Sequence, residues 1–381
     1  MKAYFDNAAT TPMRDEVITA MHVAMKSCFG NPSSTHQYGR EAKSYIELAR
    51  KEIATLLGAH PSEIVFTSGG TESDNTVLRT AVKDLGIKTI ISSTIEHHAI
   101  LHTLDALKNE GIAIAYVNLM PDSQIDYAHL EQLLVDAKGP TLVSLMHVNN
   151  EIGTILDLER VGHLCHHHQA LFHTDAVQGV GHFEFDLSQL PVDFLSAAAH
   201  KFHGPKGVGF SFIRQGTGLH PFIVGGAQER GMRAGTEAVH SIVGMHTALQ
   251  LAYANLKEEH HYILGLKKAF ISGIQKIYPT AQFNGLCADT AKSTYTLVNV
   301  ALPITEKQKM LLDFQLDLKD VACSKGSACQ SGSSKGSHVL QALNVDFDKT
   351  ASLRFSFSMF NTMEEVEYVL SVLSDFAKTD L

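Results

Sequence analysis

The feature that most constrains the fold is a regular alternation of short apolar segments with longer stretches of helical periodicity. Each short apolar segment is predicted as a buried strand, because a strand that is covered on both faces has no polar side. Strands that alternate with helices in this way form a mainly parallel sheet with helices on its faces. The chain is therefore predicted to adopt an α/β fold. The predicted strands lie at residues 64–66, 89–91, 112–117, 142–146, 170–173, 194–195 and 208–212.

The length of the chain and the pattern after residue 238 predict a second, smaller domain. The chain has 381 residues, which is longer than one typical domain. Helical periodicity covers residues 238–278, and the remainder alternates strands and helices on a smaller scale up to a last helix at 363–376. No linker rich in Pro, Gly or Ser is visible, so we expect the two parts to pack tightly. The predicted domains are a large one at 13–255 and a small one formed by 1–12 and 256–381.

Charge and composition restrict the class of partner. The net charge is -9 and no stretch is rich in Lys or Arg, so neither nucleic acid nor an anionic membrane surface is expected as the main partner. The absence of a long apolar run and of a signal-like opening predicts a cytoplasmic protein without membrane contact. Five scattered cysteines without metal-ligand spacing predict reduced thiols. A small molecule is therefore the expected ligand.

A glycine-containing turn at residues 67–72 follows a predicted strand and precedes a predicted helix. Thr71 and Asp74 have the spacing of a capping box, which would start the helix at this point. The free N–H groups of a helix N-terminus suit a phosphate, and Gly69 and Gly70 allow the backbone to approach it closely. A plain structural turn is the alternative. No dinucleotide or nucleoside-triphosphate fingerprint follows any early strand, so the phosphate belongs to another kind of molecule.

An acid and a lysine follow later strands. Asp175 lies just past a buried strand, at the edge where open α/β sheets bind ligands, and a protonated ring nitrogen would hold its carboxylate ionised. A helix N-cap is an equally good interpretation of Asp175 alone. Lys201 lies among apolar and aromatic residues, where loss of water favours the neutral amine that forms a Schiff base. Pyridoxal phosphate (PLP) needs such a lysine together with an acid, so Asp175 and Lys201 predict PLP jointly.

Two residues near the end of the chain could act on a substrate. Cys329 lies in a stretch of small residues with nearby lysines, which favours an exposed loop and a partly ionised thiol; a chance surface thiol is the alternative. Arg354 interrupts an apolar alternating strand, where it could bind a carboxylate ligand or form an internal salt bridge. The consecutive histidines at 166–168 point in different directions on a helix, so no metal site is predicted there.

Taken in order, these segments resemble the cysteine desulfurases of the NifS/IscS group, which are class V aminotransferases of PLP fold type I. The resemblance covers nearly the whole chain and implies a large PLP-binding domain with a mainly parallel seven-stranded sheet, next to a smaller α+β domain with a mobile loop at about 323–337. The segments that carry it are residues 6–12, 30–34, 66–75, 96–97, 146–151, 175–178, 200–201, 229–236, 326–329 and 354–356.

The resemblance implies that L-cysteine is converted to L-alanine while its sulfur is left on Cys329 as a persulfide. It also implies a homodimer, with Thr236 reaching the site of the other subunit, and an acceptor protein that takes the sulfur toward iron–sulfur clusters or thio-modified nucleic acids. Lys201 is implied to bind PLP and to move the Cα proton, and His97 to stack on its ring as an acid or base. The other implied residues are Asp175 for the ring nitrogen, Gln178 for the phenolic oxygen, Gly70, Thr71, His200 and Thr236 for the phosphate, and Asn150 and Arg354 for the substrate carboxylate.

Three departures from the family pattern limit these implications. Ala198 stands where a serine usually binds the phosphate, which would weaken cofactor binding. Ala227 replaces a usual glycine, and the chain stops soon after Phe376, without the longer tail by which some relatives dock an iron–sulfur scaffold. A selenocysteine lyase, a small-amino-acid aminotransferase and a non-catalytic sulfur-relay subunit are the alternative functions.

Overall fold

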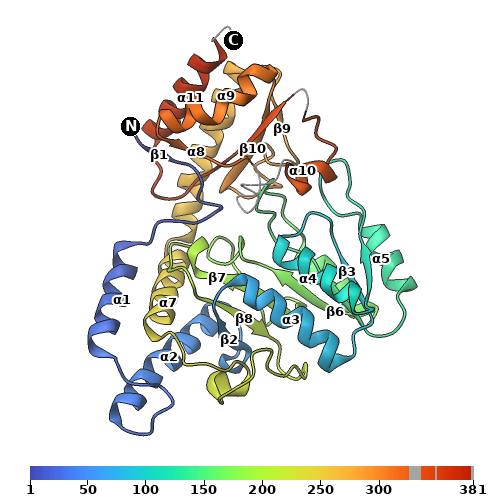
Figure 1. Cartoon of the computed structure of the whole chain (residues 1–381), viewed down its shortest axis with the longest axis vertical. Helices are drawn as coiled ribbons and strands as arrows, with labels where there is room; N and C mark the ends of the chain where they lie inside the picture. Colours follow the sequence, from blue (N-terminus) through green and yellow to red (C-terminus); the bar gives the residue numbers. More distant parts are fainter. Residues whose placement is uncertain (326–335, 348–349, 379–381) are drawn as a thin grey trace.

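A seven-stranded sheet forms the centre of the molecule in the computed structural model, which describes residues 1–325, 336–347 and 350–378 (Figure 1). The strand order is β2-β8-β7-β6-β5-β3-β4. The strands from β7 to β4 are parallel to their neighbours, whereas β8 is antiparallel to both β7 and β2. The predictions of seven strands and a mainly parallel sheet are confirmed. The strands are β2 Ile64–Thr67, β3 Thr89–Ser92, β4 Ala113–Tyr116, β5 Thr141–Ser144, β6 Leu171–Asp175, β7 Phe194–Ala198 and β8 Gly209–Ile213.

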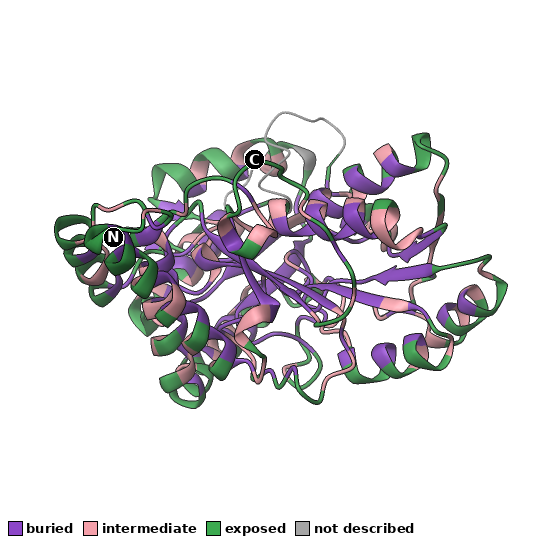
Figure 2. Ribbon diagram, turned by 90° about the horizontal axis from the view of Figure 1, so that it is seen from below, coloured by how far each residue is buried: buried purple, intermediate pink, exposed green. Residues whose placement is uncertain are grey.

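Helices cover both faces of this sheet, and the strands between them are buried along most of their length (Figure 2). One face is covered by α1, α2, α5, α6 and α7, and the opposite face by α3 and α4. In α2 the buried residues Ala42, Ile46, Ala49 and Ile53 follow helical spacing, so they form a single apolar stripe toward the core. These helices are α1 Asp15–Ser27, α2 Gln37–Leu56, α3 Gly70–Leu85, α4 His98–Asn109, α5 Tyr127–Asp136, α6 Leu158–His167 and α7 Val239–Ala254.

A three-stranded antiparallel sheet of order β12-β10-β9 lies above the central sheet in Figure 1. Its apolar core also contains Ala3 and Phe5, because β1 pairs in parallel with β11 and so brings the start of the chain beside the end. The elements here are β1 Ala3–Tyr4, α8 Leu256–Ile277, β9 Gln282–Phe283, β10 Leu297–Leu302, α9 Glu306–Leu318, β11 Val321–Ala322, α10 His338–Ala342, β12 Ala351–Ser356 and α11 Met363–Ala377.

The region predicted to be helical at 238–278 consists of two helices. Asn255 separates α7 from α8 with non-helical backbone angles, φ -109° and ψ 9°. Its side-chain amide donates to the carbonyl of Leu251, which satisfies one of the last carbonyls of α7. The break lets α8 leave the central sheet and run toward the three-stranded sheet (Figure 1). Among the described residues, no helix combines the length and apolar character that crossing a membrane requires.

Candidate active site

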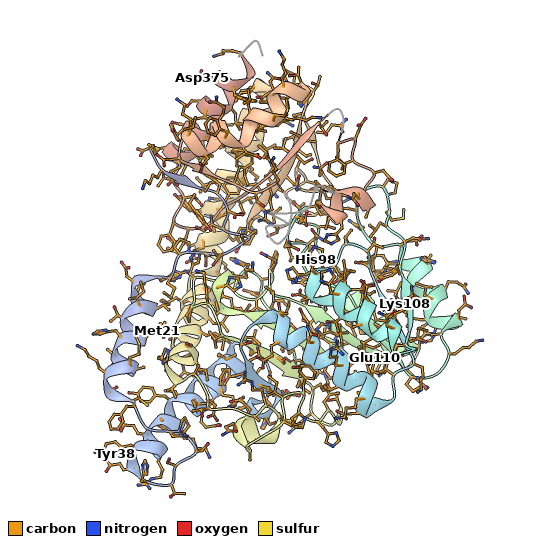
Figure 3. All side chains as sticks on the ribbon, in the orientation of Figure 1. Met21, Tyr38, His98, Lys108, Glu110 and Asp375 are labelled. Carbon is orange, nitrogen blue, oxygen red and sulfur yellow. The ribbon has the colours of Figure 1, made fainter. Side chains whose placement is uncertain are left out.

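A cavity of about 210 Å³ opens at the carboxyl ends of β6 and β7, where the central sheet meets the three-stranded sheet. In Figure 3 the labelled His98 lies at this junction, at the start of α4. Strands of a parallel sheet all end at one edge, so residues that follow different strands come together there. The cavity is lined by Ala8, Ala9, Gly70, Thr71, Asp74, His97, His98, Met146, Val148, Asn150, Glu151, Asp175, Val177, Gln178, Ala198, His200, Lys201, His338 and Arg354.

Lys201 follows β7 in the short 3-10 helix η2 Ala199–Lys201 and reaches the cavity with its amine. Its Nζ donates to the carbonyls of Ala8, at 2.6 Å, and Ala9, at 2.8 Å. These carbonyls belong to the N-terminal segment, nearly two hundred residues away in sequence. The amine is therefore held in the cavity by the start of the chain, which no pattern around Lys201 indicates.

Asp175 ends β6 and is buried in the wall of the same cavity as Lys201. One of its oxygens accepts from the backbone N–H of Val177, at 2.9 Å. No helix of the described chain begins directly after Asp175, so the N-cap interpretation is wrong. Burial raises the pKa of Asp175, and the positive charge of Lys201 partly offsets this effect. A cationic ring nitrogen would favour the ionised carboxylate further.

The glycine turn forms one end of the cavity, but its predicted capping box is wrong. Helix α3 begins at Gly70, with Gly69 as its N-cap, and the described residues supply no side-chain cap. Asp74 is instead turned inward, 1% exposed, with one oxygen 3.6 Å from the Nε2 atom of His173. Gly69 has φ +147°, a conformation that a side chain would strain. The first N–H groups of α3 therefore remain available to an anion in the cavity.

Histidines and an amide complete the region around Lys201. Burial lowers the pKa of His97 and of His200 to about 4, and the charge of Lys201 adds to both shifts. The Nδ1 atom of His97 accepts from the N–H of Ala99, at 3.1 Å, as the N-cap of α4. The side chain of Gln178 donates to the carbonyl of Ala8, at 2.8 Å. Both imidazoles are neutral at neutral pH, and the proton of His97 lies on Nε2.

Arg354 lies in β12, Asn150 lies in the segment that follows β5, and both line the cavity. The side chain of Arg354 is 1% exposed; its Nη1 donates to the carbonyl of Asn150 and its Nη2 to Asp6, each at 2.8 Å. The internal salt bridge that was the alternative interpretation is thus present. The Nε atom of Arg354 is buried and has no hydrogen-bond partner among the described residues, so it can still bind a carboxylate.

Two predicted site residues are not brought into this cavity by the described structure. Thr236 is exposed in the segment between η3 Gln228–Gly231 and α7. Cys329, with most of the loop predicted at 323–337, lies outside the described residues. The flanking residues that are described contact the cavity wall: the backbone of Ser324 pairs with that of Arg354, and the hydroxyl of Ser337 donates to the carboxylate of Glu151.

The structure also brings residues into the cavity that the sequence patterns did not single out as site residues. Glu151, His98 and His338 line it, and burial raises the pKa of Glu151 and lowers the pKa of both histidines. Glu151 directly follows Asn150, and His98 directly follows His97. Their position next to predicted site residues could have indicated them. His338 lies far along the chain, and no local pattern indicates it. Of the two substitutions that depart from the family pattern, Ala198 lines the cavity and Ala227 is exposed outside it.

The cavity suits a molecule that combines an aldehyde, a basic ring nitrogen and a phosphate. Lys201 offers the amine, Asp175 the buried carboxylate and the start of α3 the anion-binding N–H groups. Two buried polar atoms of the wall, Asp74 Oδ1 and Arg354 Nε, have no hydrogen-bond partner among the described residues. PLP has all three functional groups, and its amino-acid substrates bring a carboxylate. The fold and the cavity are those of PLP-dependent enzymes of fold type I.

Comparisons with known proteins agree with this class. The family described as aminotransferase class-V matches residues 3–369. A cysteine desulfurase IscS from Dictyoglomus turgidum is 42% identical over 98% of this chain and 93% of its own length. A solved NifS-like protein has a TM-score of 0.90 at 36% identity, covering 98% of this chain and 99% of its own. The structure titled SspA in complex with cysteine has a TM-score of 0.81 at 31% identity, covering 95% and 100%. The chain belongs to the class V aminotransferase family, in its group of PLP-dependent NifS/IscS cysteine desulfurases.

Proposed function

We propose that this chain is a PLP-dependent cysteine desulfurase, which removes sulfur from L-cysteine, releases L-alanine and holds the sulfur as a persulfide on Cys329. The observation that carries the proposal is the meeting of Lys201, Asp175 and Arg354 around one cavity. The printed names of the relatives, which are cysteine desulfurases, support the choice of reaction.

The proposed roles follow from where each group lies. Asp175 binds the ring nitrogen and Gln178 the phenolic oxygen, while Gly70, Thr71 and His200 bind the phosphate. When bound, PLP supplies an electron sink for the negative charge left on Cα. Lys201 would hold the cofactor's aldehyde and carry the Cα proton, and His97 would lie against the ring and donate a proton from Nε2. The thiolate of Cys329 would attack the substrate sulfur, so that an S–S bond forms as the Cβ–S bond breaks. The electron pair of the broken bond would stay with Cβ, which takes up one proton, and return of the Cα proton would give alanine.

The substrate carboxylate is proposed to bind to the side chain of Asn150 and to Arg354. Both line the cavity, and the buried Nε of Arg354 has no partner among the described residues. A carboxylate between an amide and a guanidinium would place Cα within reach of Lys201 and His97. This orientation determines which bond of the substrate is aligned for cleavage.

The assembly and location of the enzyme are part of the proposal. The exposed Thr236 would reach the phosphate in the site of a second copy, giving a homodimer with two shared sites. Residues 13–255 would form the large domain, and residues 1–12 with 256–381 the small one that carries Cys329. The enzyme would work in the cytoplasm, bind neither membrane nor nucleic acid directly, and pass sulfur to an acceptor protein.

The test is a turnover measurement on the purified chain reconstituted with PLP. We expect a visible absorption band from the cofactor bound to Lys201, and formation of alanine from L-cysteine in the presence of a reductant. Lys201→Ala should abolish alanine formation. A chain that cannot be reconstituted with PLP would contradict the proposal.

The Cys329→Ser variant separates this reaction from related ones. Sulfide release from L-cysteine should be lost, because none of the thiols among the described residues lines the cavity. Cys28→Ser, at the end of α1, is the matched control and should keep the wild-type rate. If Cys329→Ser keeps most of its rate, the chain is a lyase or an aminotransferase that does not use this thiol.

A further inference from the structure

Asn299 lies directly opposite Arg354 in the three-stranded sheet, outside the set of predicted site residues. Strands β10 and β12 are antiparallel, and Asn299 is the register partner of Arg354. Side chains at opposed positions of an antiparallel pair lie on the same face of the sheet. Both residues are buried, with exposures of 0% and 1%. Asn299 and Arg354 therefore approach the cavity wall side by side.

The two side chains bind consecutive carbonyls of one buried turn. Nη1 of Arg354 donates to the carbonyl of Asn150, at 2.8 Å, and Nδ2 of Asn299 donates to the carbonyl of Glu151, at 2.9 Å. The N–H groups of the same turn are satisfied from within it, because Oδ1 of Asn149 accepts from Glu151 and from the following residue. Buried backbone groups need such partners, so the turn depends on Asn299 for one of its carbonyls.

The amide of Asn299 is itself held in one orientation. Its Oδ1 accepts from the side-chain amide of Asn284, at 2.8 Å, and its backbone carbonyl accepts from the N–H of Asn284, at 2.9 Å. The Sγ of Cys287 donates to the same carbonyl, at 3.1 Å. With Oδ1 engaged in this way, only Nδ2 can face Glu151. Asn299 is thus a rigid donor rather than an adaptable one.

We propose that Asn299 is a positioning residue for the substrate carboxylate. It fixes the turn that carries Asn150, while Arg354 is fixed to the same turn by its own hydrogen bond. The two proposed carboxylate-binding groups are thereby held at a set separation in the wall of the cavity that Lys201 also lines. The inference rests on the proposed function, since it needs Asn150 and Arg354 to bind the carboxylate.

The experiment compares two ligands that differ by a carboxylate. L-alanine and ethylamine are titrated separately into the PLP-loaded protein, and binding is followed by the change in the visible spectrum of the cofactor. In Asn299→Ala we expect the affinity for L-alanine to fall about tenfold, equivalent to ~1.4 kcal/mol, with the affinity for ethylamine unchanged within about twofold. Asn299→Leu removes the amide donor but fills the space of the side chain better than alanine does. It should give the same result: weaker binding of L-alanine and unchanged binding of ethylamine.

Controls distinguish positioning from a general loss of structure. Val300→Ala removes a buried side chain from the next position of β10, which points to the other face, and should leave the ratio of the two affinities unchanged. The proposal would be overturned if the affinities for L-alanine and ethylamine fell equally in the Asn299 variants, or if neither affinity fell. Failure of both variants to fold would overturn it as well. If the wild-type protein binds L-alanine no better than ethylamine, the proposed carboxylate site itself is wrong.

Discussion

Single buried residues set the protonation state of the cavity wall. Burial lowers the pKa of His97 and His200 to about 4, and the charge of Lys201 acts in the same direction, so both rings are neutral at neutral pH. Burial raises the pKa of Glu96 to about 8, and its carboxyl accepts from the backbone N–H of Met146, a residue of the cavity lining. With both imidazoles neutral, Lys201 and Arg354 are the cationic side chains of the cavity lining that can attract an anionic ligand.

Ala198→Ser should strengthen cofactor binding. Ala198 ends β7 in the cavity wall near the start of α3, and a hydroxyl there could donate to the phosphate. One added hydrogen bond contributes about 0.5–1.5 kcal/mol, or about two- to twelvefold in affinity. Titration of the apoprotein with PLP measures the dissociation constant. Ala227→Gly, outside the cavity, is the control; equal or weaker binding in Ala198→Ser would contradict the expectation.

Glu96→Gln should make stability less dependent on pH. The folded protein holds the Glu96 proton up to about pH 8, whereas the unfolded chain loses it near 4.5, so the folded state binds more protons in between. This contribution to stability is complete below about pH 4.5 and is lost as the pH rises to about 8. Glutamine keeps the oxygen that accepts from Ser93 and Met146 but does not ionise. The free energy of unfolding, measured with urea at pH 5 and pH 8, should rise in Glu96→Gln relative to the wild type as the pH increases. A difference between the two proteins that is the same at both pH values would contradict this expectation.

At the scale of elements, long-range polar contacts connect segments that are separate in sequence. The buried pair Arg50–Glu229 joins α2 to η3, with Nη1–Oε2 at 2.7 Å and Nη2–Oε1 at 2.8 Å. The carboxylate of Glu229 also accepts from the N–H of Phe66 in β2, at 2.8 Å. Glu229 has φ +48°, an uncommon angle for a residue with a side chain. These contacts hold the segment that leads to Thr236 against the central sheet.

Arg50→Ala should destabilise the protein strongly. Removing one partner leaves the carboxylate of Glu229 buried without its charge partner, which typically costs about 3–5 kcal/mol. Arg79→Ala is the matched control, because Arg79 pairs with Glu110 at the surface, where a pair contributes about 0–1 kcal/mol. Both free energies of unfolding can be measured with urea. A loss below about 1 kcal/mol in Arg50→Ala would mean that the carboxylate finds water or another donor.

At the scale of the whole molecule, the first ten residues connect the two sheets. Phe5 packs in the core of the three-stranded sheet, with its ring centroid 5.4 Å from that of Phe357. A few residues later, the carbonyls of Ala8 and Ala9 accept from Lys201 at the end of the central sheet. The start of the chain thus couples packing in the core of the three-stranded sheet to the position of the Lys201 amine in the cavity (Figure 1).

Phe5→Ala should reduce both stability and cofactor affinity. The side chain is fully buried, and deleting a buried phenyl ring costs about 3–5 kcal/mol. A loosened N-terminal segment would also hold Lys201 less well, so PLP should bind more weakly to the variant. Met310→Ala, at an exposed position of α9, should change stability by less than about 0.5 kcal/mol. A Phe5→Ala protein with wild-type PLP affinity would show that the two effects are independent.

The sequence alone determined the mainly parallel sheet and the order of turn, acid and lysine along it. Buried strands and helices have local periodicities, and residues that follow parallel strands meet at one edge whatever the details of packing. Each predicted strand overlaps an observed one, and their ends differ by at most three residues. For the same reason the sequence predicts that Asp175 and Lys201, which follow two different strands, lie close together.

Only the tertiary structure decided which side chains complete the site. The predicted capping box is absent because the side chain of Asp74 points inward to His173. The break at Asn255 depends on the direction in which α8 packs against the rest of the molecule. Contacts of Lys201 with the N-terminal segment, and of Asn299 with the turn at Glu151, join residues far apart in sequence. Such contacts follow from burial and from the partners that buried polar groups need, which no local pattern encodes.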